Sequence, residues 1–421
     1  MSDTPRVLRP NRAQLELRPT DLEGLLPEDH RARAVWDFVC GLDLSPWYDE
    51  IRSLEGEAGR PAIDPAILLS LWIYATLEGV GSARAVGRLC EQHDAYRWIC
   101  GGVSVSYRTL AAFRVSHEEK LDALLTESVV RLVDAGLVRM DRIAQDGMRV
   151  RASAGAASFR RRTRLRELER AVQKRIVGLR RELEADPAAT SRRVQAAREK
   201  AAEDRRRRVR RALEQLRKRS EEKKPAERES VRASTTDPEA RVMKMADGGF
   251  RPAYNVQLAT DVGSQVVVGL EVTDVGSDMH QLAPMLEQLD DRYGELPTEA
   301  LVDGGFASLG AIESAEAQGC RVYAPPMQPR NADRNPYRPM RDDSDHVARW
   351  RRRMGAASAQ QKYKDRAATA ECVNAQSRNR GLWQFGVRGR LKARCVSLLY
   401  ALAHNAMRSV ALKQACAEAP S

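Results

Sequence analysis

A long basic segment with helical periodicity interrupts a series of strand-like segments in this 421-residue chain. Its first apolar stripe recurs at spacings of three and four, which predicts an amphipathic helix. Asp186-Pro187 breaks the pattern, and a second stripe follows. The first stripe comprises Leu165, Leu168, Val172, Ile176, Leu179 and Leu183, and the second comprises Val194, Ala197, Ala201, Val209, Leu213 and Leu216. We therefore expect residues 158–235 to form a helical hairpin inserted into another domain.

The charge of this segment narrows the choice of partner. Residues 160–232 hold 27 Lys and Arg against 13 Asp and Glu, whereas the net charge of the whole chain is only +12. The basic excess is therefore local, and it points to a polyanion. The N-terminus has no apolar signal core, and the longest apolar run, 66–77, is too short to span a bilayer. Nucleic acid is therefore a better candidate for the partner than a membrane surface.

Two arginine runs in the hairpin are candidates for phosphate contacts. They are Arg160, Arg161 and Arg162, and then Arg205, Arg206, Arg207 and Arg208. As a phosphate-tracking arm, the hairpin would lose DNA affinity steeply with salt. A solvated hairpin without a ligand is the alternative.

Strand patterns lie on both sides of the insertion. They cover 142–150, 253–261, 265–272, 299–302 and 321–324, with a helix pattern over 280–294 and a long helical C-terminus. The first pattern allows either a strand pair or a strand and a turn. This order predicts a mixed α/β sheet flanked by helices, built from 136–157 and 236–412 and followed by a tail at 413–421.

Residues 1–135 predict a helical N-terminal domain. One helix begins at Asp64-Pro65 and ends near Gly79, and a second runs from Ser82 to Gly101. A third region, 106–136, is one helix or two. Short helices with glycine-rich joints suit a helix-turn-helix-like DNA-binding domain, but many small helical domains share that pattern.

The seven cysteines are scattered and form no CxxC pair. That distribution argues against a zinc site or a disulfide framework. It favours a reducing compartment, so we expect a cytoplasmic protein.

Three acidic residues stand out by their context. Asp146 (AQDGMRV) and Asp303 (ALVDGGF) are each expected at a strand end and are each followed by Gly, which lets the chain turn sharply there. Glu371 lies in a helical pattern. Phosphodiester cleavage can use two divalent ions about 4 Å apart, held by carboxylates. Mg²⁺ prefers such hard oxygen ligands. An Asp before Gly is, however, more often an ordinary turn residue.

Taken together, these segments resemble the DDE transposases of bacterial insertion sequences, whose catalytic domain has an RNase H-like fold. AQDGMRVRAS is similar to the family's first-Asp strand, ADGGFRPAYNVQLATD to its second strand, and EALVDGGFAS to its second-Asp segment. YKDRAATAECVNAQSRNRG is similar to the Tyr–Arg–Glu signature helix, here Tyr363, Arg366, Glu371 and Arg378. The stretch from LPEDH to RWICGG resembles the helical front domain of one branch.

The resemblance implies that Asp146, Asp303 and Glu371 bind two Mg²⁺ (or Mn²⁺) ions. Water would attack at the element's inverted repeats, and the freed 3′-hydroxyl would then attack target DNA. Tyr363, Arg366 and Arg378 would contact phosphates near the cut. The implied partner is double-stranded DNA with terminal inverted repeats, and the implied location is the bacterial nucleoid. Joining two ends calls for a homo-oligomer. A catalytically silent DNA-binding descendant, an RNase H-like nuclease without strand transfer and a helical scaffold protein are the alternatives.

The chain departs from the family pattern at three points. Four residues, rather than three, separate Arg366 from Glu371, and Arg378 stands where Lys is more common. The insertion falls between the first and second Asp rather than after the second. Two roles also stay open, since Tyr363 could be a packing residue, and His280 could be structural or a proton shuttle.

Overall fold

The computed structural model describes residues 21–53, 61–185, 191–328 and 334–418. A six-stranded sheet lies at its centre, with strand order β4-β5-β1-β7-β8 and with β6 also paired to β5. The strands are β1 (Arg142–Arg151), β4 (Arg241–Lys244), β5 (Phe250–Asp261), β6 (Val267–Thr273), β7 (Glu299–Val302) and β8 (Arg321–Tyr323).

Strand directions make this a mixed sheet. β1 pairs with β5 antiparallel and with β7 parallel, β6 is antiparallel to β5, and β8 is parallel to β7. The sequence β6-β5-β1-β7-β8 therefore has its antiparallel strands on one side of β1 and its parallel strands on the other. The expected RNase H-like α/β class is confirmed.

β1 differs from the expectation in one respect that affects the site. We expected Asp146 at a strand end and a sharp turn at Gly147, but β1 is continuous through both residues. Gly147 pairs with Gln257 of β5, and the ladder continues to Arg151. The reason is burial, because Met148 and Val150 beyond the glycine are fully buried and hold the strand on the core. Asp146 consequently lies in mid-strand.

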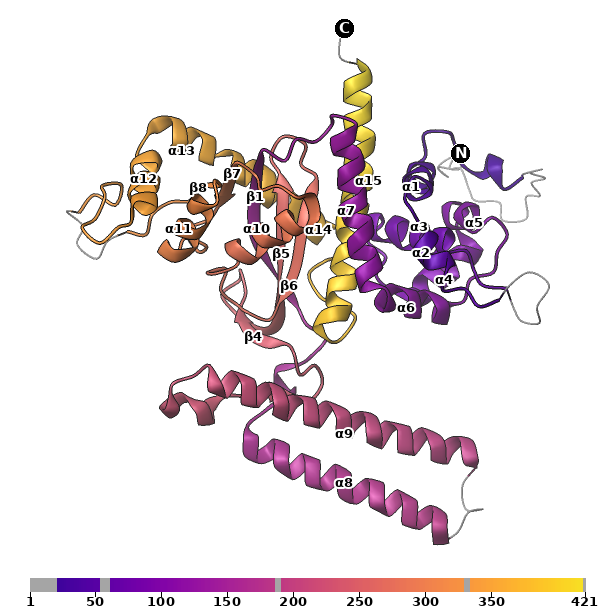
Figure 1. The fold of residues 1–421 in the computed structure, drawn as a ribbon. Helices are drawn as coiled ribbons and strands as arrows, with labels where there is room; N and C mark the ends of the chain where they lie inside the picture. Colours follow the sequence, from indigo (N-terminus) through magenta and orange to yellow (C-terminus); the bar gives the residue numbers. More distant parts are fainter. Residues whose placement is uncertain (1–20, 54–60, 186–190, 329–333, 419–421) are drawn as a thin grey trace, which may run out of the picture.

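Helices cover both faces of the sheet (Figure 1). The long C-terminal helix α15 (Arg390–Glu418) packs on the face that carries Met148 and Val150, and the Asn405 side chain bonds the backbone of β6. α10 (Leu282–Tyr293) covers the other face. The remaining helices of this part are α11 (Leu309–Ala317), α12 (Asp345–Met354), α13 (Ala357–Tyr363) and α14 (Cys372–Asn379).

The N-terminal region is helical, as expected. It contains α1 (Arg31–Cys40), α2 (Ser45–Tyr48), α3 (Pro65–Leu77), α4 (Ala83–Gln92), α5 (Asp94–Cys100), α6 (Tyr107–Ser116) and α7 (Glu118–Asp134). The second expected helix is divided in two because the His93 ring caps α5 at the Ala95 amide. The third region also forms two helices, which separate at His117. This helical region shares its main hydrophobic core with α15 and with one face of the sheet.

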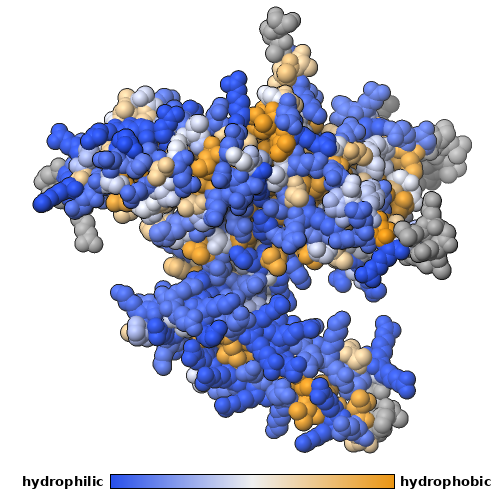
Figure 2. Space-filling model, viewed as in Figure 1, coloured by the Kyte–Doolittle hydropathy of each residue, from blue (hydrophilic) through white to orange (hydrophobic). Residues whose placement is uncertain are grey.

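The basic insertion forms the expected antiparallel hairpin of α8 (Arg162–Ala185) and α9 (Arg192–Glu221). It projects from the body beneath β4 in Figure 1, joined by a short ribbon of β2 (Phe159–Arg160) and β3 (Ala233–Ser234). Leu165, Ala212 and Leu216 form a small core at its base. Leu183 and Val194, toward its far end, are exposed. Figure 2 shows a mostly hydrophilic surface along the hairpin.

Hydropathy gives no helix in the described part of the chain that is both long and apolar enough to cross a bilayer.

Candidate active site

The register of β1 and β7 brings two of the three predicted carboxylates together. Gln145 of β1 lies opposite Val302 of β7 in a parallel pair. Asp146 and Asp303 are the next residues along each strand, so their side chains leave neighbouring positions on the same side of the sheet. The structure thus joins residues that are more than 150 positions apart in the sequence.

Backbone amides hold both aspartates in place. The Gly147 amide donates to Asp146 Oδ1 at 2.9 Å, and the Gly305 amide donates to Asp303 Oδ1 at 2.7 Å. In each case the second carboxylate oxygen is left for other partners. For Asp146 that partner is the Asn374 side chain of α14, whose Nδ2 donates to Oδ2 at 2.9 Å.

Gly147 also makes room for a polar cluster on the opposite face of the sheet. A Cβ at this position would lie 2.1 Å from Asp278 Oδ1 and 2.5 Å from Gln257 Nε2. The Asp278 carboxylate accepts hydrogen bonds from Asn255 and Gln257, each at 2.7 Å. Glycine is therefore needed here because other side chains approach the backbone closely. It is not needed for the turn that the sequence suggested.

Burial makes the Asp146 carboxyl a weaker acid than an ordinary aspartate. Its pKa is raised from 3.8 to about 6, mainly by removal from water and in smaller part by the Asp303 charge, against the opposing effect of the Arg366 guanidinium. Arg366 Nη1 lies 3.9 Å from Asp146 Oδ1, too far for a direct hydrogen bond. The pair of aspartates is thus short of positive charge.

Glu371 reaches this group through Arg366. Arg366 Nη2 donates to Glu371 Oε1 at 2.8 Å, while the Glu371 side chain is 57% exposed. Its exposure leaves room for the Glu371 side chain to rotate once the contact with Arg366 is broken, whereas the two aspartates are held by backbone amides. The structure therefore places Glu371 beside the aspartates with a guanidinium between them.

A π-helical turn at Ala367–Glu371 carries this arrangement. A π turn accommodates one more residue than an α-helical turn, and such turns are frequent at functional sites. The sequence has one residue more between Arg366 and Glu371 than the pattern it resembles. The π turn absorbs that residue, so the Arg366 and Glu371 side chains still meet.

The other predicted contact residues lie around this centre. Tyr363 ends α13, packs partly against the core under β7, and has Arg366 above its ring at 5.9 Å. Burial raises the pKa of its hydroxyl, and Arg366 opposes that rise. Arg378 is exposed on α14, seven residues after Glu371. His280 is exposed, with φ of 71°, and precedes Gln281, the residue at the N-cap of α10.

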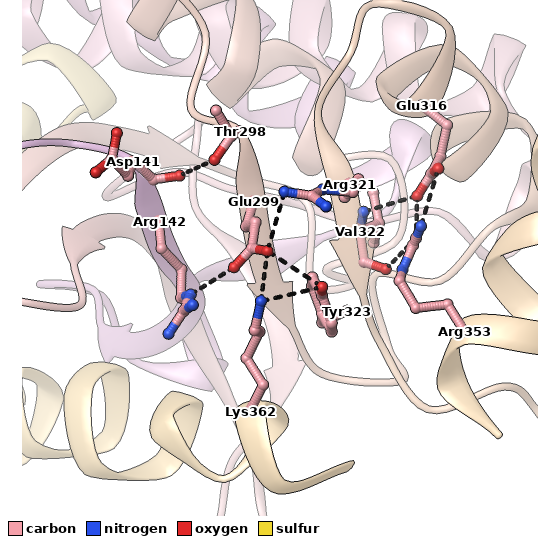
Figure 3. Close-up of polar contacts among 10 residues, drawn as sticks. All are labelled: Asp141, Arg142, Thr298, Glu299, Glu316, Arg321, Val322, Tyr323, Arg353 and Lys362. Atoms are coloured by element: carbon pink, nitrogen blue, oxygen red, sulfur yellow. Dashed lines mark hydrogen bonds and ion pairs between the residues drawn. The ribbon is translucent and has the colours of Figure 1, made fainter. Parts of the chain in front are cut away.

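A buried acidic residue at the opposite end of β7 fixes the strand register on which the site depends. Figure 3 shows Glu299 surrounded by groups from β1, β8 and α13. Arg142 Nε and Lys362 Nζ each lie 2.6 Å from its carboxylate, and the Tyr323 hydroxyl lies 3.2 Å away. These cations lower the pKa of Glu299 against the effect of burial. Lys362 directly precedes Tyr363, so the same cluster also positions the segment leading to Arg366.

The arginines predicted in the hairpin lie in a different part of the molecule. Arg160 is in β2, Arg161 and Arg162 are exposed at the start of α8, and Arg205, Arg206, Arg207 and Arg208 occupy α9. Within the part of the chain that is described, no hydrogen bond or ion pair connects them to the three carboxylates. Any joint action of the two groups requires a ligand long enough to contact both.

The donor atoms present suit a hard divalent cation, but they are not yet gathered around one point. Asp146 and Asp303 supply carboxylates, and Asn374 Oδ1 is buried without a hydrogen-bond partner next to them. Oxygen donors of this kind are those that Mg²⁺ prefers. Across residues 21–418, outside the undescribed gaps, no three His, Cys, Asp or Glu side chains are close enough to hold an ion. The distant member is Glu371, whose carboxylate is engaged by Arg366.

Sequence reasoning missed two polar residues of this region. Asn374 lies three residues beyond Glu371 in the same segment. This spacing puts the two side chains on the same face of a helix, and it could have identified Asn374 as a site residue. Asp278 offered none, because it lies in an irregular loop and meets Gly147 only through the fold.

Comparisons with known families agree with the arrangement. Residues 20–116 match the family model described as "Transposase domain (DUF772)". Residues 227–406 match the model described as "Transposase DDE domain", which includes Asp303 and Glu371. No curated protein and no solved structure matches the chain.

Proposed function

Since this chain belongs to the DDE transposases of insertion sequences, we propose that it cleaves DNA at the ends of its element and transfers the freed strands into target DNA. The transposase assignment rests on the two family models, which together span both the helical front region and most of the sheet. The cleavage and joining steps are our proposal.

One observation carries this proposal. The parallel pairing of β1 with β7 puts the Asp146 and Asp303 carboxylates side by side, and burial leaves Asp146 in need of a compensating positive charge. A phosphoryl-transfer site needs such a concentration of negative charge to bind divalent cations beside a phosphodiester.

We assign the metal-binding role to Asp146, Asp303 and Glu371. Two divalent cations, Mg²⁺ or Mn²⁺, would supply activation of the attacking oxygen and stabilisation of the leaving oxygen. Glu371 joins the aspartates by rotating away from Arg366, which its exposure permits. Once Glu371 has moved away, the Arg366 guanidinium is available to bind a DNA phosphate. Guanidinium groups bind phosphate through two parallel hydrogen bonds.

Contacts with DNA would extend from this centre. Tyr363 and Arg378 lie on either side of the π turn at Ala367–Glu371 and would contact phosphates flanking the cut. The arginines of the hairpin would bind the duplex farther away. Because two ends must be joined, we propose that the active form is a homo-oligomer.

A cleavage assay tests the function. Purified protein is incubated with Mg²⁺, a duplex that carries the element's inverted repeat, and a supercoiled target. We expect nicked ends and joined products with the wild type, and neither product with Asp146→Ala, Asp303→Ala or Glu371→Ala. Asp291→Ala, a change at an exposed residue of α10, is the control and should behave as the wild type.

The products also separate the rival functions. Cut DNA without joined DNA would identify a nuclease without strand transfer. Binding without cutting in Mg²⁺ or Mn²⁺ would identify a catalytically silent DNA-binding protein. Equal cutting by wild type and Asp146→Ala would refute the assignment of the site.

A further inference from the structure

A small polar pocket lies where the hairpin meets the body of the protein. It has a volume of about 210 Å³ and is lined by Leu168, Arg205, Arg208, Val209, Thr235, Thr236 and Arg388. The three arginines come from two separate elements, since Arg205 and Arg208 are on α9 and Arg388 is in the connection between α14 and α15. Thr235 and Thr236 follow β3.

Charge makes this pocket a site for an anion. No acidic residue lines it. In the run of four arginines on α9, Arg206 and Arg207 pair with acidic residues three positions earlier, at Glu203 and Asp204. Among residues whose placement is described, neither Arg205 nor Arg208 has such a salt bridge. The two that face the pocket are therefore the two whose charge is available.

Asp237, a buried acidic residue close enough to Arg388 to interact with its charge, has one of its two carboxylate oxygens occupied. The buried Asp237 carboxylate accepts a hydrogen bond from Tyr254 at 2.7 Å and one from the Gly389 amide at 3.2 Å. The Arg388 charge lowers its pKa, although burial raises that pKa overall. Among the residues that the structure describes, Arg388 donates only to the Ser153 carbonyl, at 3.3 Å, so its other guanidinium nitrogens remain available.

The walls of the pocket are held before any ligand binds. Thr235 donates through its amide to the Ser158 carbonyl at 3.0 Å, and the Thr236 amide donates to the Ser234 hydroxyl at 3.0 Å. On the other side, the Arg390 amide donates to Glu239 at 2.7 Å. Because a preformed site loses little conformational entropy on binding, the pocket can hold one small anion with defined geometry.

We propose that this pocket binds one phosphate group of the DNA backbone, gripped jointly by Arg208 of the hairpin and Arg388 of the body. Guanidinium groups bind phosphate through charge-assisted, bidentate hydrogen bonds, and a hydroxyl group such as that of Thr236 completes such sites. A phosphate held here fixes the hairpin relative to the connection that follows α14, the helix adjoining Glu371. The choice of DNA as the source of the phosphate rests on the proposed function.

A double-mutant cycle tests whether the two arginines hold the same phosphate. Binding of an inverted-repeat duplex is measured by fluorescence anisotropy for wild type, Arg208→Ala, Arg388→Ala and the double variant. Removing either arginine should weaken binding about tenfold, as expected for a charged hydrogen bond. The double variant should bind the duplex no more weakly than either single variant, because each single variant has already lost the contact with the shared phosphate. In all three variants, the slope of log K against log salt concentration should become shallower by about the contribution of one phosphate contact.

Lys218→Ala is the matched control. It removes one positive charge from the same helix, α9, but from an exposed side chain that pairs with Glu214. We expect less than a twofold loss of affinity. Circular dichroism of all variants checks that the hairpin remains helical. A twofold or smaller effect of Arg208→Ala and Arg388→Ala, or additive losses in the double variant, would overturn the proposal.

Chemically modified DNA identifies the source of the phosphate. Replacing backbone phosphates one at a time with neutral methylphosphonate should reveal one position that weakens wild-type binding but leaves the double variant unaffected. If no position behaves in this way, and inorganic phosphate raises the melting temperature of wild type but not of the double variant, the pocket binds a free anion and the DNA assignment is wrong.

Failure of this inference is distinguishable from failure of the proposed function. If the wild type cuts and joins DNA while the two arginines act additively, only the pocket is refuted. If the arginines are coupled but no cutting occurs, only the catalytic proposal is refuted.

Discussion

Replacing Asp146 by Asn should stabilise the metal-free protein while abolishing its catalysis. Burial raises the pKa of this carboxyl from 3.8 to about 6. Each pKa unit corresponds to about 1.4 kcal/mol, so at pH 8 the ionised carboxylate lowers the free energy of unfolding by about 3 kcal/mol. Asn removes the charge and keeps nearly the same shape.

The surroundings should accept the amide. Its oxygen can still receive the Gly147 hydrogen bond. The Asn374 side chain can turn over and present Oδ1, which is buried without a partner, to the new amide nitrogen. Arg366 loses an ion pair of 3.9 Å but keeps its 2.8 Å contact with Glu371. We therefore expect a net gain of about 1–3 kcal/mol at pH 8.

The sign of the pH dependence provides a second check. An acid whose folded-state pKa is raised binds its proton more tightly in the folded protein, so stability falls as the pH rises from about 4 to about 6. Urea unfolding in EDTA, followed by tryptophan fluorescence, should show this loss in the wild type but not in Asp146→Asn. Asp291→Asn, in an exposed position, should retain the wild-type profile. A variant that is less stable than wild type at pH 8 would refute the reasoning.

Two further substitutions test the structural supports of the site. Glu299→Gln should destabilise the protein by about 2–4 kcal/mol at pH 7, because it leaves partly buried Arg142 and Lys362 without their carboxylate. Because the pKa of Glu299 is lowered, the stability that its ionised carboxylate contributes is present above about pH 4.5 and is lost as the pH falls through the folded-state pKa. The urea midpoints of variant and wild type should therefore converge in acid. A difference in midpoint that stays constant at all pH values would contradict this explanation. Gly147→Ala should cost about 1–3 kcal/mol in urea unfolding, since its Cβ would lie 2.1 Å from an Asp278 oxygen. Gly310→Ala, which meets nothing within 4 Å in α11, should be neutral or stabilising, and equal effects of the two would show that space is not the cause.

Periodic patterns predicted the architecture well. The apolar stripes of the insertion predicted the hairpin because helix pairing depends on the same 3.6-residue period that the stripes display. The alternation around Arg142 and the short apolar run before Asp303 predicted β1 and β7. β4 and the β2–β3 ribbon were not predicted, because two to four residues are too few to show a period.

The site was predictable only in part. Asp146 and Asp303 could be named from their strand contexts, but their proximity follows from the β1–β7 register, which long-range packing and the Glu299 cluster determine. Sequence gave the wrong reason for Gly147, because the glycine accommodates Asp278 from a distant loop. The extra residue before Glu371 looked like a departure from a pattern, and its accommodation by a π turn required coordinates.

The central claim is that Asp146, Asp303 and Glu371 jointly bind divalent cations beside DNA. The most direct measurement is a titration of Mn²⁺, followed by electron paramagnetic resonance, with the chain bound to an uncleavable inverted-repeat duplex. We expect tight binding of two ions per chain by the wild type, and loss of tight binding in Asp303→Asn and Glu371→Gln with the duplex still bound. Tight Mn²⁺ binding that is unchanged in these variants would contradict the claim.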